Sequence, residues 1–112
     1  MEIIMKKYIN NIMVRTIYYD RKHGGCIRIL NRINETKSII KGVYGIDESP
    51  KGYWFAEVTH LDKDTVIDDN IYNMTVDFKF KKNVQHKEKL YAYMQNYRIY
   101  WEDGNVWLQM SA

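Results

Sequence analysis

The sequence predicts an all-β fold, a small antiparallel sandwich or closed barrel of about eight strands, on the strength of three observations. Residues that favour strands are abundant, since 10 Tyr, 3 Trp and 3 Phe give an aromatic share of 14%. Residues typical of turns recur at short intervals along the chain, which is the spacing of a sandwich or barrel. The segment 73–82 alternates apolar and polar residues with a period of two, as a strand with one buried face requires.

Between the turn signals we expect strands near 11–20, 26–33, 38–46, 52–61, 73–82, 88–94, 97–102 and 105–110. The segment 62–72 is predicted to be a long connection, and residues 1–10 fit either a short helix or a leading strand. No linker, repeat or change of composition divides the chain, so residues 1–112 are predicted to form a single domain.

The alternation within these strands also predicts which side chains are buried. Glycines near 42–45 are expected at a bend or a close backbone approach, and either Tyr53 or Trp54 then anchors the core, depending on the phase of its strand. The predicted core consists of Ile27, Ile29, Val58, Met74, Val76, Phe78, Phe80, Leu90, Ile99, Trp101, Val106 and Leu108.

The C-terminal third is predicted to be a three-stranded meander. Asp103-Gly104 is typical of a two-residue hairpin turn. Such a turn would place residues whose numbers sum to 207 opposite each other, for example Tyr100 opposite Trp107. A second tight turn at Gln95-Asn96 adds the strand before it. One side of this meander then carries mostly apolar residues: Leu90, Ala92, Met94, Tyr97, Ile99, Trp101, Val106, Leu108 and Met110.

The opposite side of the meander is the candidate binding surface. It carries aromatic and basic side chains: Lys89, Tyr91, Tyr93, Arg98, Tyr100 and Trp107. Aromatic residues and arginine are enriched at protein interfaces, and rings interspersed with cations are also how many proteins bind single-stranded nucleic acids. The alternative without a binding function is that this side packs on a second layer or lines the barrel interior.

Other function classes have less support in the sequence. The net charge of +3 permits contact with a polyanion without requiring it. The three histidines and Cys26 show no metal-ligand spacing, no serine has the surroundings of a catalytic nucleophile, and no cofactor motif is present. With a single cysteine no internal disulfide can form, and no leader or apolar span is recognised, so we expect a cytosolic protein without metal, cofactor or membrane.

The final hairpin, residues 99–107 (IYWEDGNVW), resembles the W-x-D-G-x-V-W ending of small uncharacterised β proteins of large DNA viruses and some protists. The resemblance covers about a dozen residues. It implies a small β-barrel or sandwich of viral origin, with a virion-associated or host-interaction role, and it supplies no site residue.

Three functions remain open from the sequence. The first is a non-enzymatic interaction module that uses the aromatic-basic side for a protein partner or for self-association. The second is binding of single-stranded nucleic acid by the same side. The third is a barrel that encloses a small apolar ligand, with that side turned inward. No residue pattern argues for an enzyme.

Overall fold

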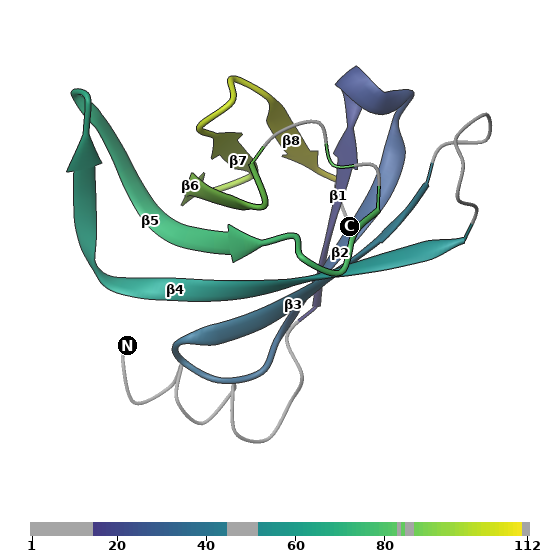
Figure 1. Cartoon of the computed structure of the whole chain (residues 1–112), viewed down its shortest axis with the longest axis horizontal. Coiled ribbons are helices and arrows are strands. Elements are labelled where there is room, and N and C mark those ends of the chain that lie inside the picture. The colour runs from purple at the N-terminus through teal and green to yellow at the C-terminus, as the bar shows by residue number, and fades with distance from the viewer. Residues whose placement is uncertain (1–14, 45–51, 83, 85–86, 111–112) are drawn as a thin grey trace.

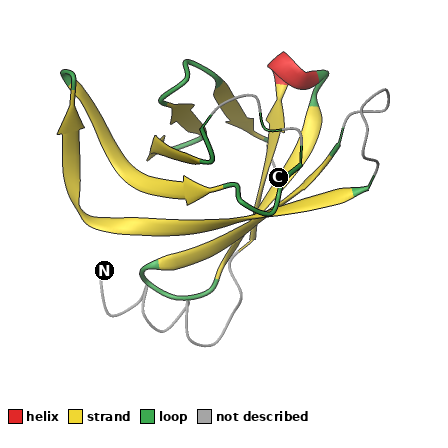
Figure 2. Cartoon of the chain, in the orientation of Figure 1, coloured by secondary structure: helices red, strands yellow, loops and turns green. Residues whose placement is uncertain are grey.

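The computed structural model describes residues 15–44, 52–82, 84 and 87–110. The predictions for residues 1–10 and 11–14 lie outside these ranges. The described chain consists of strands and one short 3-10 turn (Figures 1 and 2): β1 (Arg15–Asp20), η1 (Arg21–His23), β2 (Cys26–Arg32), β3 (Lys37–Val43), β4 (Tyr53–Ile67), β5 (Asn70–Asp77), β6 (Lys89–Gln95), β7 (Arg98–Trp101) and β8 (Val106–Gln109).

The strands form a closed antiparallel barrel rather than a sandwich. Each strand pairs with the next one along the chain, and β8 returns to pair with β1. Closure gives each strand a partner on both sides within the barrel, so the barrel itself has no open edge. The prediction of an all-β fold with about eight strands is therefore confirmed.

The inward side chains of all eight strands form one core. Its buried apolar members are Tyr18, Leu30, Ile40, Trp54, Ala56, Val58, Met74, Val76, Phe78, Leu90, Ala92, Ile99, Trp101 and Trp107. Seven of the twelve predicted core residues are buried here: Val58, Met74, Val76, Phe78, Leu90, Ile99 and Trp101. Of the two candidate anchors, Trp54 points inward and Tyr53 is exposed.

Three of the core predictions were wrong, two because of the phase of β2 and one because β5 ends early. In β2 the inward positions belong to Arg28 and Leu30, so Ile27 is 40% exposed and Ile29 only partly buried. Phe80 is 59% exposed because β5 ends at residue 77, and the alternation that predicted its burial does not extend into the turn that follows.

The segment 62–72 is paired strand, so the prediction of a long connection was wrong. Residues 65–67 of β4 pair with residues 70–72 of β5 around a turn in which Asp68 and Asp69 both have positive φ, as a two-residue hairpin turn requires. This part of the hairpin pairs with no other strand, and it extends beyond the barrel as an arm (Figure 1). The acidic residues 62, 64, 68 and 69 made this segment resemble a loop, and Val66 and Ile71 are 65% and 51% exposed because the arm lies outside the barrel core.

The register between β7 and β8 differs by one residue from the predicted one. Ile99 lies opposite Trp107, and Tyr100 lies opposite Val106. The loop has three residues, 102–104, rather than two: Gly104 has φ 94°, its N–H donates to the Trp101 carbonyl (2.9 Å), and the Trp101 N–H donates to the carbonyl of residue 105. This is the three-residue hairpin with a bulge glycine.

A shift of one residue exchanges the two faces of β8. Trp107 therefore points into the core, whereas Val106 and Leu108 point outward and are only partly buried, which corrects their predicted burial. Tyr97 and Met110, also placed on the apolar side, are 71% and 43% exposed.

Between β6 and β7 the predicted faces are correct. Gln95 pairs with Arg98, so the turn is formed by Asn96 and Tyr97, one residue later than predicted. Moving the turn by one residue along the chain shifts the register between the two strands by two residues. Because side chains alternate with a period of two, every side chain stays on its predicted face. In the described part of the chain, no helix has the length and apolar character needed to span a bilayer.

Candidate functional site

The outer surface of β6 and β7 carries five of the six predicted site residues, which we call the tyrosine face: Lys89, Tyr91, Tyr93, Arg98 and Tyr100. Tyr93 lies directly opposite Tyr100 in the antiparallel pair, so the two rings are nearest neighbours across the strands. Lys89 begins β6 and Arg98 begins β7, which places the cations at opposite ends of the aromatic row.

Contacts with neighbouring elements hold the tyrosine face in place. The ring of Tyr91 packs against Tyr72 of β5, with ring centroids 5.5 Å apart. The side-chain amide of Asn73 donates to the Met94 carbonyl and accepts from the Met94 N–H, both at 2.8 Å. The Asn73 side chain thus continues the β5–β6 ladder where the arm bends away, and the strand that carries the tyrosines is fixed at both edges.

Trp107, the sixth predicted site residue, is absent from this face. Only 4% of its surface is exposed, and its ring packs inside the barrel against Trp101, with centroids 4.6 Å apart. The reason is the three-residue loop described above. The prediction that Trp107 joins the binding surface was therefore wrong, and Val106 and Leu108 take the outward positions beside the tyrosine face.

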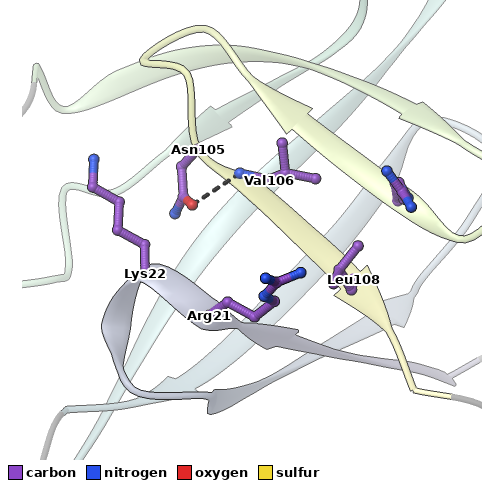
Figure 3. A pocket seen from close by; sticks show the side chains of 6 residues that line it. Arg21, Lys22, Asn105, Val106 and Leu108 are labelled. Carbon is purple, nitrogen blue, oxygen red and sulfur yellow. Dashed lines mark hydrogen bonds between the residues drawn. The ribbon is translucent and has the colours of Figure 1, made fainter.

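A hollow of about 370 Å³ lies next to the tyrosine face and was not predicted from the sequence. Figure 3 shows Arg21 and Lys22 of η1 on one side of it, and Asn105, just before β8, with Val106 and Leu108 of β8 on the other; Arg98 of the tyrosine face completes the lining. The three cations are exposed, and the lining contains no acidic side chain. The sequence signal for this hollow is the pair of basic residues that opens the turn after β1.

A buried carboxylate, Asp20, links the two walls of the hollow through hydrogen bonds. Asp20 is 2% exposed, and its Oδ1 accepts a hydrogen bond from Asn105 Nδ2 (3.1 Å). Its Oδ2 accepts from Trp107 Nε1 (3.1 Å) and lies 2.7 Å from Nδ1 of His23 in η1. Asp20 therefore ties η1, which carries Arg21 and Lys22, to the start of β8.

The counter-charge of Asp20 is the buried guanidinium of Arg28. Arg28 Nη2 lies 3.5 Å from Asp20 Oδ2, and Nη1 donates to the Val43 carbonyl (2.9 Å). The guanidinium also stacks between the rings of Trp54 and Trp107, at 5.0 and 5.6 Å from their centroids. The sequence signal for this network was the arginine at position 28 among the apolar residues of β2. The predicted phase of β2 turned this residue outward, so the network was not expected.

At another inward position of β3 and β4, Ser38 and His60 form a hydrogen bond of 2.7 Å between Oγ and Nε2. Burial, followed by the positive charge of Arg32, lowers the pKa of His60 from 6.5 to about 4. The imidazole is thus neutral at neutral pH. No carboxylate is hydrogen-bonded to this ring in the described residues, so the pair lacks the orienting acid of a catalytic triad.

The pKa of His60 predicts a loss of stability in acid. Because the folded pKa lies below the unfolded one, the unfolded chain takes up the proton first, and stability present above pH 6.5 declines as the pH falls towards 4. We expect a loss of about 2 kcal/mol between pH 7 and 4.5, reduced for the partial exposure of the ring. Urea unfolding at both pH values should show this loss in the wild type and a smaller one in His60→Gln. Equal losses in the two proteins would contradict the assignment.

Among the described residues, no group of three or more His, Cys, Asp or Glu side chains is arranged to hold a metal ion. Asp62, Asp64, Asp68 and Asp69, which faintly resemble a calcium loop in sequence, lie along β4 and the turn of the arm. Cys26 is a partly buried free thiol at the start of β2.

Comparisons with known proteins gave no match, so the site is interpreted from its own chemistry. The resemblance of the final hairpin to viral and protist proteins stays a prediction. No protein-family model matches the chain, and neither a curated protein nor a solved structure matches it.

Proposed function

We propose that the chain is a non-enzymatic binding module that recognises a protein partner through the tyrosine face. The observation that carries the proposal is the direct opposition of Tyr93 and Tyr100 on the outer surface of the barrel, with Tyr91 beside them. Tyr and Arg are the residue types that most often carry the binding energy of interfaces. A reducing compartment such as the cytosol suits the free thiol of Cys26, and we propose it as the location.

The partial exposure of the tyrosine rings, together with their packing against neighbours, supports this function over a purely structural role. Tyr100 is 39% exposed although it lies on a well-paired strand, whereas Tyr91 and Tyr93 are half-buried. Rings that already have neighbours lose little side-chain entropy when a partner covers them, which raises the affinity obtained for a given contact area. Such a surface is suited to binding without rearrangement of the barrel.

Selection from a displayed peptide library tests the proposal without knowledge of the natural partner. We expect the wild type to enrich a peptide family whose affinity falls at least about 30-fold in Tyr93→Ser/Tyr100→Ser, because interface hot spots contribute about 2 kcal/mol or more. Tyr53→Ser is the matched control, since Tyr53 is 63% exposed and projects from β4. Failure to enrich any family, or equal losses in both variants, would overturn the proposal.

Self-association is the form of this function that can be tested with the chain alone. Sedimentation velocity over a wide concentration range would show whether the wild type dimerises. Dimerisation that is lost in Tyr93→Ser/Tyr100→Ser and kept in Tyr53→Ser would identify a second copy as the partner.

Single-stranded nucleic acid is the second candidate. The arrangement of side chains along the tyrosine face favours this candidate, because Lys89 and Arg98 lie on either side of rings that could stack on bases. The inward position of Trp107 takes one ring from the predicted stacking surface. Titration with labelled DNA and RNA oligomers distinguishes this candidate, because phosphate contacts make affinity fall steeply with salt.

A small-ligand barrel has less support. That hypothesis turns Tyr100 and Trp107 inward around a ligand, but they lie on opposite sides of the barrel wall. The described inward side chains pack against one another in one cluster.

A further inference from the structure

The hollow beside the tyrosine face concentrates positive charge that no other described side chain neutralises. Arg21, Lys22 and Arg98 all line it, and none of these three side chains forms an ion pair or hydrogen bond with another described residue. Of the two carboxylates that are hydrogen-bonded to Asn105, Asp20 is buried and already accepts from several donors, and Asp103 accepts from the Asn105 N–H (3.0 Å). Neither lines the hollow. Three like charges around one concavity favour an anion there.

The shape and lining of the hollow indicate which anion. Two of its cations are guanidinium groups, whose planar forks bind two oxygens of a phosphoryl group at once. A phosphoryl group carries a charge of about −1.5 to −2 and three acceptor oxygens, so it matches three cations better than one carboxylate does. The remaining lining, Val106 and Leu108, is apolar and extends along β8 away from Lys22 (Figure 3).

We propose that this hollow is a phosphoryl-binding subsite that receives a phosphorylated side chain of the protein partner bound across the tyrosine face. The inference rests on the proposed function and adds the chemistry of the ligand. Arg98 belongs to both the hollow and the tyrosine face, so one partner segment can occupy the two together. The apolar residues of β8 contact the stem or ring that carries the phosphate.

Rigid walls support the assignment. η1 is fixed by His23 bound to Asp20, and by the N–H of Gly25 donating to the Asp20 carbonyl at 2.8 Å. The opposite wall is fixed by Asn105, whose side-chain oxygen accepts from the Val106 N–H at 2.8 Å (Figure 3). The backbone of both walls is therefore held in place before a ligand arrives, which lowers the entropic cost of binding.

Small probes test the subsite independently of the tyrosine face. In titrations of the full chain followed by backbone amide NMR, inorganic phosphate and phenyl phosphate should shift residues 21–22, 98 and 105–108. Phenyl phosphate should bind about tenfold more tightly, because its ring also covers Val106 and Leu108. Arg21→Gln and Arg98→Gln should each weaken phenyl phosphate about tenfold or more, whereas Arg15→Gln, an exposed cation at the far end of β1, should not. Shifts elsewhere, or equal effects of all three variants, would overturn the inference.

Peptides then connect the subsite with the proposed function. A peptide selected by the wild type, resynthesised with a phosphorylated residue, should bind at least about tenfold more tightly than its unmodified form, and Arg21→Gln should remove the gain. Tyr93→Ser/Tyr100→Ser should weaken this peptide but leave phenyl phosphate binding unchanged. Loss of the phosphate effect with retention of peptide binding would refute the subsite alone. Tighter binding of oligonucleotides than of any phosphopeptide would assign the hollow to a nucleic-acid backbone and overturn the inference.

Discussion

Replacing Gly42 by alanine is expected to destabilise the barrel by about 3 kcal/mol, because the added methyl group overpacks a filled part of the core. A Cβ at this position would lie 2.2 Å from Cζ2 and 2.4 Å from Cε2 of the Trp54 ring. The ring cannot move aside easily, because it stacks on the Arg28 guanidinium and packs against Phe78, with ring centroids 5.7 Å apart. Chemical unfolding followed by tryptophan fluorescence measures the loss.

The reason for this sensitivity lies in the register of three strands. Gly42 of β3 lies between Arg28 of β2 and Trp54 of β4 in a continuous row of inward positions. The absence of a side chain on the middle strand lets the indole lie across it and reach the guanidinium. The glycine thus provides the space in which the cation and the ring meet.

Two further variants separate crowding from other effects. Trp54→Leu removes the crowding atoms, so adding Gly42→Ala to it should cost well under 1 kcal/mol, a strong departure from additivity. Gly104→Ala is the control for backbone strain: its Cβ would meet nothing within 4 Å, but its φ of 94° is unfavourable for alanine, so we expect a loss of about 1–2 kcal/mol. An equal cost of Gly42→Ala with and without Trp54 would contradict the explanation.

The fold class followed from the sequence because period and turn chemistry are local properties. The alternation from residue 73 to 77 placed Met74 and Val76 in the core correctly. The sequence of β8 did not fix its own phase: Val106 and Leu108 are apolar, and so is Trp107 between them, so either set could face inward. The choice depended on whether the loop had two or three residues, and Asp103-Gly104 is compatible with both.

The candidate site was predictable to the extent that it depended on β6 and β7. These strands carry polar or aromatic residues on one side and small or aliphatic ones on the other, so their faces were assigned correctly. The hollow depends instead on η1 lying beside β8, which is a consequence of barrel closure through the β1–β8 pair. No local pattern reports the contact between segments separated by 85 positions, as Asp20 and Asn105 are.

Replacing Asp20 by alanine is expected to cost about 4 kcal/mol, because it removes one partner of a buried ion pair. The guanidinium of Arg28 stays buried without its counter-charge, and the donors of Trp107 and Asn105 lose their acceptor. Asp20→Asn keeps one acceptor oxygen at similar volume, so we expect an intermediate loss. Asp64→Ala, on an exposed carboxylate of β4, should change the free energy of unfolding by less than about 0.5 kcal/mol.

The charge of Arg28 gives this prediction its sharpest test. If the uncompensated cation causes the loss, then Asp20→Ala/Arg28→Met should be at least as stable as Asp20→Ala, since methionine fills the space between Trp54 and Trp107 without a charge. If the loss comes from the hydrogen bonds to Trp107 and Asn105, the second substitution should add a further cost. The two outcomes have opposite signs in urea unfolding. Since Asp20 also links η1 to β8, Asp20→Asn should weaken phenyl phosphate binding in the hollow even where the barrel remains folded.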